Sequence, residues 1–193
     1  TGYTGSSGYV LCFASFNSEL YAGVQGGYVL DKLVSNTFVQ ASTLNNSGYS
    51  INSMCAYNSF LYCSGTFVVG PVQNLAKFNG TSFSAIGSGQ NTPLLLNVSP
   101  QVLGYANSMK VFNNKLWVGG SFVTAGGVSS PYLAAWSSVS GTWTSAYASP
   151  TALNSDVHSL DTGLTGSPST NYLYVGGSFT GPYKHVMRGV TNV

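Results

Sequence analysis

The chain has 193 residues, of which 44% are hydrophobic and only 5% are charged, with a formal net charge of +2. That length and hydrophobic content suit one domain with a packed core. The few scattered charges argue against attraction to nucleic acid or to an acidic membrane surface. No run approaches the roughly 18 apolar residues of a membrane-spanning helix, so we expect no nucleic-acid partner and no membrane span.

A phrase made of leucine, an aromatic residue and small residues recurs four times along the chain. Its clearest copies read LWVGGSF from Leu116 and LYVGGSF from Leu173, and shorter versions begin at Leu20 and Leu61. In the first three units a short lead-in such as Phe16-Asn17-Ser18 precedes the phrase. A period of roughly 40 to 57 residues is typical of repeat architectures, in which each copy folds as one supersecondary unit.

Alternation of apolar and polar residues between turn signals predicts short β-strands. No long run of apolar residues with the 3.6-residue period of an amphipathic helix occurs. Pairs such as Asn58-Ser59 and Asn79-Gly80 predict hairpin turns, because these residues tolerate positive φ. The Gly pairs after the second strand of a unit predict a bend where side chains would clash. The predicted strands cover residues 10–16, 20–24, 29–34, 37–41, 51–57, 60–69, 73–78, 82–86, 108–112, 115–122, 132–136, 142–146 and 185–190.

Four short strands per unit, with aromatic residues at regular places, predict an all-β fold and more specifically a β-propeller of four-stranded antiparallel blades. We expect a single domain over residues 1–193 with about four blades, the last of them incomplete. The expected blades are residues 9–44, 51–89, 104–148 and 155–193, and residues 1–8 are a candidate closing strand.

The Gly-Gly pair, followed by an aromatic such as Tyr132 or Trp136 and then by Trp143, resembles the kelch blade pattern. The phrases LWVGGSFVTAGG and KFNGTSFSAIGSG are still more similar to the repeats of the Rax2 family of fungal cell-surface polarity proteins and of extracellular bacterial repeat proteins. The resemblance covers nearly the whole chain and implies an extracellular propeller. It departs at Ala22 and Ser64, where the later copies have Val and Gly.

The fourth unit runs only through its third predicted strand, which leaves a sheet edge of the kind that proteins normally cover. Three coverings stay open: residues 1–8 of the same chain, a strand donated by a neighbouring chain, or further blades outside this segment. Donation between identical chains is heterologous and yields a filament where it does not close. We expect a homo-oligomer or polymer that assembles through this open blade edge.

The three cysteines, Cys12, Cys55 and Cys63, show no metal-ligand spacing. With a two-residue loop at Asn58-Ser59, Cys55 faces Tyr62 and Cys63 lies on the other side of the ribbon. With a three-residue loop the two cysteines would face each other, and a cross-strand disulfide could form. The sequence leaves both alternatives open, so Cys55 and Cys63 are a disulfide candidate.

The residues Asp156, His158 and Asp161 form the one local cluster of acid-base groups. On a strand, Asp156 and His158 share a face, whereas Asp161 points the other way. Nothing nearby in the sequence offers a nucleophile or a second carboxylate at a characteristic spacing, and no metal-ligand spacing occurs. We expect a protein that is not an enzyme and has no cofactor, no metal and no catalytic residues.

Three N-glycosylation triplets start at Asn45, Asn79 and Asn97, all at predicted turns or loops. Because the surface is nearly uncharged, attached glycans are a plausible source of solubility, although turn formation alone explains an Asn-Gly pair. Weaker candidates for contact with a ligand are Tyr105, Tyr183 and His158. The two tyrosines lie outside the repeated aromatic position and could stack on sugar rings.

These observations together predict an extracellular structural propeller, on a cell or virion surface, that forms an assembly or filament by strand sharing. The alternative hypothesis is a carbohydrate-binding or adhesive propeller module that uses loops at one mouth of the ring.

Overall fold

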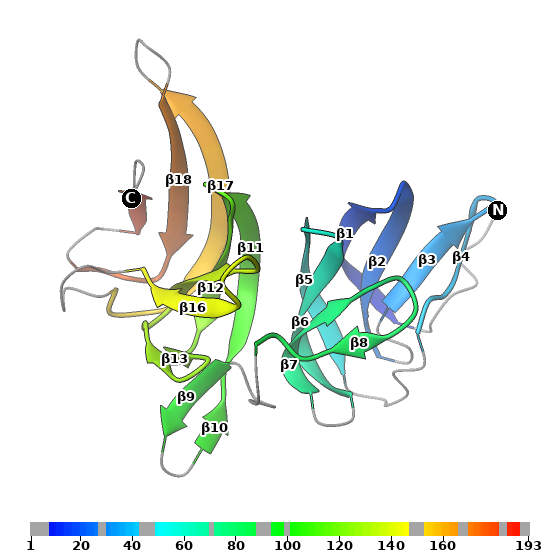
Figure 1. Cartoon of the computed structure of the whole chain (residues 1–193), viewed down its shortest axis with the longest axis horizontal. Helices are drawn as coiled ribbons and strands as arrows, with labels where there is room; N and C mark the ends of the chain where they lie inside the picture. Colours follow the sequence, from blue (N-terminus) through cyan, green and yellow to red (C-terminus); the bar gives the residue numbers. More distant parts are fainter. Residues whose placement is uncertain are drawn as a thin grey trace. The chain divides into compact units, whose positions relative to one another are not determined.

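The computed structural model describes residues 8–26, 30–42, 49–69, 72–87, 94–98, 101–146, 153–165, 170–181 and 185–189 (Figure 1). Throughout these ranges the regular secondary structure consists of β-strands, so the prediction of an all-β fold is confirmed. The chain divides into two compact units, residues 1–93 and 94–193, each of which is described by itself below.

The first unit contains two antiparallel meanders. Their strands pair in chain order, apart from one residue pair, Gln25 with Ser50, that joins the meanders into a single sheet. The first meander consists of β1 (Tyr9–Phe16), β2 (Glu19–Gln25), β3 (Leu30–Val34) and β4 (Thr37–Gln40). The second meander consists of β5 (Ser50–Tyr57), β6 (Phe60–Val69), β7 (Val72–Phe78) and β8 (Phe83–Ser84).

The second unit contains two further meanders and a small extra sheet. The third meander consists of β11 (Tyr105–Phe112), β12 (Lys115–Ser121), β15 (Leu133–Ser137) and β16 (Thr142–Ser145). The fourth meander consists of β17 (Val157–Thr165), β18 (Thr170–Gly177) and β19 (Val186–Gly189). The extra sheet, which the sequence did not predict, pairs β9 (Leu94–Val98) with β10 (Gln101–Leu103) and with β13 (Thr124–Ala125), which pairs in turn with β14 (Val128–Ser129).

The lead-in asparagines form the hairpin turns that the sequence predicts. Both residues of the Asn17-Ser18, Asn58-Ser59 and Asn113-Asn114 pairs have positive φ, the conformation that matches the twist of the flanking strands. The turn at Asn79-Gly80 is longer than predicted, because Phe78 pairs with Phe83 and leaves four residues between them.

A β-bulge occupies the same position in the first strand of all four meanders. The registers shift between Val10 and Cys12, between Ile51 and Ser53, between Ala106 and Ser108, and between Val157 and Ser159. One extra residue therefore lies in each first strand, and a bulge bends the strand and increases its twist. The extra residues are Leu11, Asn52, Asn107 and His158.

The bulges explain the second glycine of the repeated phrase. A Cβ at Gly65, Gly120 or Gly177 would overlap the carbonyl oxygen of Ser50, Tyr105 or Asp156, each of which lies at the start of the opposing bulged strand or directly before it. The predicted clash is therefore confirmed, and it arises from backbone of the neighbouring strand rather than from a special φ angle.

Each meander has two faces, which we name by their residues. The front face carries the aromatic of the phrase (Tyr21, Tyr62, Trp117 or Tyr174). In the first strand, the residue just before the partner of this aromatic points to the opposite side, so the back face carries Phe13, Met54, Met109 or Leu160.

The same faces meet in both units. In the first unit the Tyr21 ring on the front face of the first meander lies 6.0 Å from the Phe78 ring on the back face of the second. In the second unit Phe112 and Trp117, from the front face of the third meander, share one core cluster with Leu160 and Val175, from the back face of the fourth.

We predict that Gly120→Ala destabilises the second unit by about 1–3 kcal/mol, because the added methyl group displaces the bulged strand β11. All the tryptophans of the chain, Trp117, Trp136 and Trp143, lie in the third meander, so tryptophan fluorescence during urea unfolding reports on this unit. The control is Gly141→Asn, at a position with open space and a φ of 67° that Asn tolerates. A Gly120→Ala midpoint equal to that of the wild type would refute the clash.

Candidate functional site

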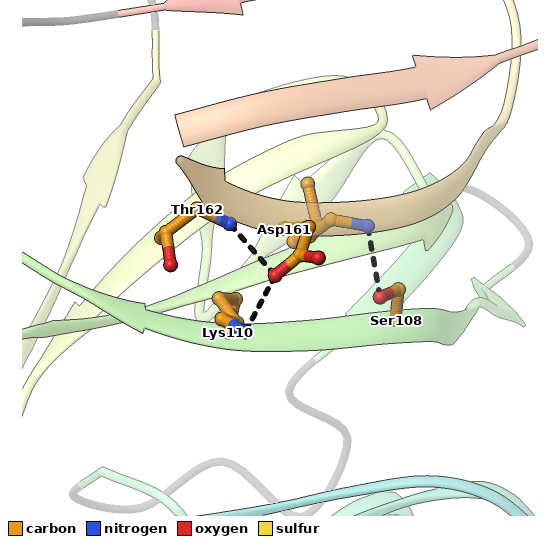
Figure 2. A network of polar contacts seen from close by, with 5 residues as sticks. Ser108, Lys110, Asp161 and Thr162 are labelled. Carbon is orange, nitrogen blue, oxygen red and sulfur yellow. Dashed lines mark hydrogen bonds and ion pairs between the residues drawn. The ribbon is translucent and has the colours of Figure 1, made fainter. Parts of the chain in front are cut away.

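The polar groups of the second unit concentrate where β11 lies beside β17 (Figure 2). The side-chain amide of Asn107 donates to the carbonyl oxygen of Val157 at 2.8 Å, and the Leu160 amide donates to the Ser108 hydroxyl at 3.0 Å. Figure 2 shows Lys110 reaching from β11 to Asp161 on β17, with an Nζ–Oδ1 distance of 2.6 Å. These contacts fasten the first strands of two meanders together, which is a structural role.

The Asp161 carboxylate is held in its ionised form. The Lys110 ammonium group, and then the backbone N–H of Thr162 at 2.8 Å, lower the pKa of this carboxyl. Its side chain is 75% exposed, so solvent screens the ion pair and its contribution to stability is small. A solvated carboxylate with a lowered pKa is a poor general base.

Two residues of the predicted acid-base cluster have different partners. His158 is the bulge residue of β17 and is exposed, with its Nε2 2.6 Å from the Ser178 hydroxyl, whereas Asp161 pairs with Lys110. Asp156 is half-buried beside the bulge. No group of three or more His, Cys, Asp or Glu side chains with metal-binding geometry occurs within the described ranges.

The contact between His158 and Ser178 was not predicted, because the residues are twenty positions apart and only the β17–β18 hairpin brings them together. A hydrogen-bonded Ser and His form part of a nucleophilic site, which also needs donors for a developing oxyanion. The nearest backbone N–H groups are already used, since Gly177 donates to His185 and Ser178 donates to Asp156. We therefore assign this pair no chemistry.

The two tyrosines proposed as ligand contacts have different outcomes. Tyr105 is half-buried at the start of β11, where it pairs with Ser121. Tyr183 lies outside the described residues.

The hairpin of β5 and β6 has the two-residue turn, so it does not support the disulfide candidate. Cys55 pairs with Tyr62 and Cys63 pairs with Met54, which places the two sulfur atoms on opposite faces. Accordingly no disulfide joins Cys55 to Cys63. Cys63 is fully buried and Cys55 is half-buried.

The glycosylation candidates also differ in their surroundings. Asn79 is exposed, and its Oδ1 accepts hydrogen bonds from the Thr81 amide and hydroxyl, each at 2.9 Å. Asn97 lies in strand β9, paired with Val102, so its placement in a loop was wrong, because the sequence pattern hid the β9–β10 hairpin. Asn45 lies outside the described residues.

Charged side chains of the front faces contact aromatic residues, a feature that the sequence pattern did not predict. Lys32 and the Tyr21 hydroxyl both donate to Glu19 at 2.9 Å. Hydrogen bonding with Lys32 is the main cause that lowers the pKa of Glu19, and burial raises the pKa of Tyr21 to about 12. In the second meander the Lys77 ammonium lies 4.6 Å from the centre of the Phe60 ring.

Two surfaces of the described residues are left as candidates for a function. The first is the back face of the first meander, where the Phe13 side chain is 56% exposed and its ring lies 6.0 Å from that of Phe38. The second is β19, which within the described residues has a hydrogen-bonded strand, β18, on one side only.

No protein-family model and no curated protein sequence matches the chain. The resemblance to kelch and Rax2 repeats therefore stays a prediction. Among the described residues, no helix has the length and apolar character needed to cross a lipid bilayer.

Solved structures share the fold at low sequence identity. The computationally designed protein Ika4 matches 99% of this chain with 96% of its own, at a TM-score of 0.58 and 10% identity. An extracellular domain of the putative hybrid two component system BT4673 from B. thetaiotaomicron matches 97% of this chain, at a TM-score of 0.62 and 16% identity. A second structure of the BT4673 extracellular domain matches 95%, at a TM-score of 0.58 and 9% identity. This chain spans 21% and 22% of those two BT4673 chains.

We predict that maleimide at pH 7.5 labels native protein at Cys55 much faster than at Cys12 or Cys63. Burial raises the pKa of the Cys12 thiol to about 12 and that of Cys63 well above its usual range, so both lack reactive thiolate. Mass spectrometry should show one adduct on native protein and three after unfolding without reductant. The Cys55→Ser variant is the control and should take up none in its native state. A single adduct on the unfolded wild type would instead reveal a disulfide.

We further predict that Asp161→Asn destabilises the second unit by at most about 1 kcal/mol at low salt. Because the pKa of Asp161 is lowered in the folded state, the ion pair stabilises the protein above the unfolded pKa of about 3.9 and loses this effect as the pH falls through the folded value. The difference in urea midpoint between wild type and variant should therefore shrink on acidification. A difference that grows as the pH falls would contradict the assignment.

Proposed function

We propose that the chain is a non-enzymatic extracellular β-propeller that serves as a structural subunit of a surface assembly or filament. In this proposal the four meanders are blades, related to kelch-like and Rax2-like repeats. Three observations support it: the bulge at one position in all four meanders, the same pairing of front and back faces in both units, and the four-stranded order of the first three meanders.

The edge of β19, beside which no strand lies within the described residues, is the observation that carries the assembly. The first three meanders have a fourth strand (β4, β8 and β16), whereas the described part of the fourth meander has three strands. An edge strand with unpaired N–H and C=O groups is a template for pairing with another chain. We propose that a second copy supplies the missing strand, so that the copies associate through the open blade edge.

The hydrogen bonds between β18 and β19 determine which backbone groups of β19 point away from β18. The Gly177 amide donates to the His185 carbonyl oxygen at 3.0 Å, which makes Gly176 and Val186 a non-hydrogen-bonded pair in the antiparallel ladder. The backbone groups of Val186 and Arg188 therefore point away from β18, toward the open edge. A fourth strand would bond to these two residues.

An extracellular location agrees with the 5% content of charged residues and with the comparisons, since two of the matched structures are extracellular domains. Glycans at Asn79 would add solubility on a surface with so few charges. The exposed ring of Tyr9, with 78% of its side chain accessible, favours a second candidate function, which is adhesion to carbohydrate by stacking on sugar rings.

We predict that Arg188→Pro abolishes self-association of the full chain, because proline removes an N–H group that points to the open edge. The matched control is Arg188→Gln, which removes the same charge and keeps the N–H. Sedimentation velocity over a range of concentrations should show growing particles for wild type and Arg188→Gln, and single chains for Arg188→Pro. The proposal fails if Arg188→Pro associates like the wild type, or if the wild type stays a single chain at every concentration.

A further inference from the structure

Both histidines of the chain, His158 and His185, lie at one corner of the fourth meander. His158 is the extra residue of the bulge in β17, and His185 directly precedes β19. Strand β18 runs between them. Its Gly177 pairs with Val157 on one side and donates its amide to the His185 carbonyl oxygen at 3.0 Å on the other. Two exposed histidines therefore flank a strand position that carries no side chain.

The backbone holds His185 in a conformation that recurs in two other meanders. Its φ angle is 63°, and Tyr132 and Asn74, which stand at the same place before the third strand, have φ angles of 67° and 61°. The amide of His185 donates to the Phe179 carbonyl oxygen at 3.0 Å. The amide of Tyr132 makes the equivalent bond to the Phe122 carbonyl oxygen at 2.9 Å. This repeated geometry fixes the point from which the His185 imidazole extends.

Ser178 sets the orientation of the His158 ring. Its hydroxyl oxygen lies 2.6 Å from Nε2 of His158, and its amide donates to the Asp156 carbonyl oxygen at 2.9 Å. A histidine that binds a metal through one ring nitrogen holds its other nitrogen in a hydrogen bond, which fixes the ring orientation and the tautomer. With Nε2–H donating to Ser178, Nδ1 is the nitrogen that presents its lone pair.

We propose that His158 and His185 together bind a divalent transition-metal ion, such as Zn²⁺ or Ni²⁺. Imidazole nitrogen is a ligand that these ions favour. Neighbouring strands are about 4.8 Å apart, so strands on either side of β18 are separated by about 10 Å, a span that two imidazole side chains bridge from opposite sides. The described residues offer no group of three His, Cys, Asp or Glu ligands, so water completes the coordination. Metal binding needs no oxyanion donor, and the backbone bonds of Gly177 and Ser178 therefore do not oppose it.

Two other meanders carry no imidazole at either of these positions. At the bulge the second and third meanders have Asn52 and Asn107. Before the third strand they have Asn74 and Tyr132. A neutral imidazole offers a nitrogen lone pair, whereas the nitrogen of a side-chain amide is only a donor. Asparagine therefore satisfies the backbone at both positions, and only the fourth meander adds metal ligands. The histidines lie on different strands, which is why no ligand spacing in the sequence indicated this site.

Calorimetric titration of the untagged full chain with Zn²⁺ tests the inference, in a Cys55→Ser background that removes the reactive thiol. The matched variants are His158→Asn and His185→Asn, because Asn107 and Asn74 already occupy the equivalent positions. We expect a single Zn²⁺ ion to bind, and either variant to bind it at least about tenfold more weakly. Two histidines that act independently would leave each variant with one unchanged site. That result would overturn the inference, as would a background protein that does not bind Zn²⁺.

Further variants separate binding from folding. Tyr132→Asn changes the equivalent position of the third meander and should bind Zn²⁺ with unchanged affinity. Ser178→Ala should weaken binding about tenfold, because the His158 ring loses its hydrogen bond. Ser178→Thr should restore the affinity, since Thr66 stands at that place of the phrase in the second meander. Circular dichroism verifies that each variant folds. Unchanged affinity in Ser178→Ala would refute the orienting role of Ser178.

Proton NMR with paramagnetic Ni²⁺ gives a second readout. Because the chain has two histidines, the two single variants assign the imidazole resonances directly. Small amounts of Ni²⁺ should broaden the resonances of both rings in the wild type and of neither ring in the variants. Broadening of one ring alone would overturn the shared site. The site does not require self-association, so Zn²⁺ binding by a single chain supports it even if the assembly proposal fails.

Discussion

Packing of one meander's front face on the next meander's back face is the interaction on which each unit depends. A single four-stranded meander has an apolar stripe on both sides and cannot bury either one alone. The two observed pairings bury Tyr21 and Leu30 against Met54 and Phe78 in the first unit, and they produce an equivalent cluster in the second. Burial of aromatic and aliphatic side chains, at about 25 cal/mol per Å² of apolar area, is the dominant favourable contribution to such a core.

The bulge and the glycine together make this packing repeatable. Each bulge bends the first strand near its start. In the second, third and fourth meanders a glycine opposite the bulge lets a carbonyl oxygen of the neighbouring strand segment approach closely, whereas the first meander has Val24 at that position. Gly119, which directly precedes Gly120 in the phrase, allows the neighbouring sheet to pack closely, since a Cβ on Gly119 would overlap the Val157 side chain. In the second unit Ser108 and Lys110 then fasten β11 to β17. In the third meander the two glycines of the phrase therefore allow close approach of the partner strand within the sheet and of the neighbouring sheet.

The sequence predicted the local structure well, because the signals are local. Asn-Ser and Asn-Asn pairs with positive φ set the hairpins, and the strands that flank them have the expected alternation. The extra sheet of β9, β10, β13 and β14 escaped prediction because its strands are short and pair across nearly thirty residues. The turn at Asn79 was predicted too short for a similar reason, since its length depends on the pairing of Phe78 with Phe83.

The candidate site was harder to predict, because it depends on which faces are covered. Asp156, His158 and Asp161 are close in sequence, but His158 contacts Ser178 across the hairpin, and Asp161 pairs with Lys110 of another meander. The disulfide depended on a turn that differs by one residue between the two alternatives. The exposure of Phe13 could not be read from the pattern, because its equivalents in the other meanders are buried at the same repeat position. Only the substitution of Gly for a lead-in aromatic, at Gly163, signalled that the last front face differs.

An electron cryomicroscopy structure of the concentrated full chain would test the central claim most directly. The account predicts that Tyr21 packs on Phe78 in the first unit, and that Phe112 and Trp117 pack on Leu160 in the second. A structure in which these front-to-back clusters are absent would contradict it.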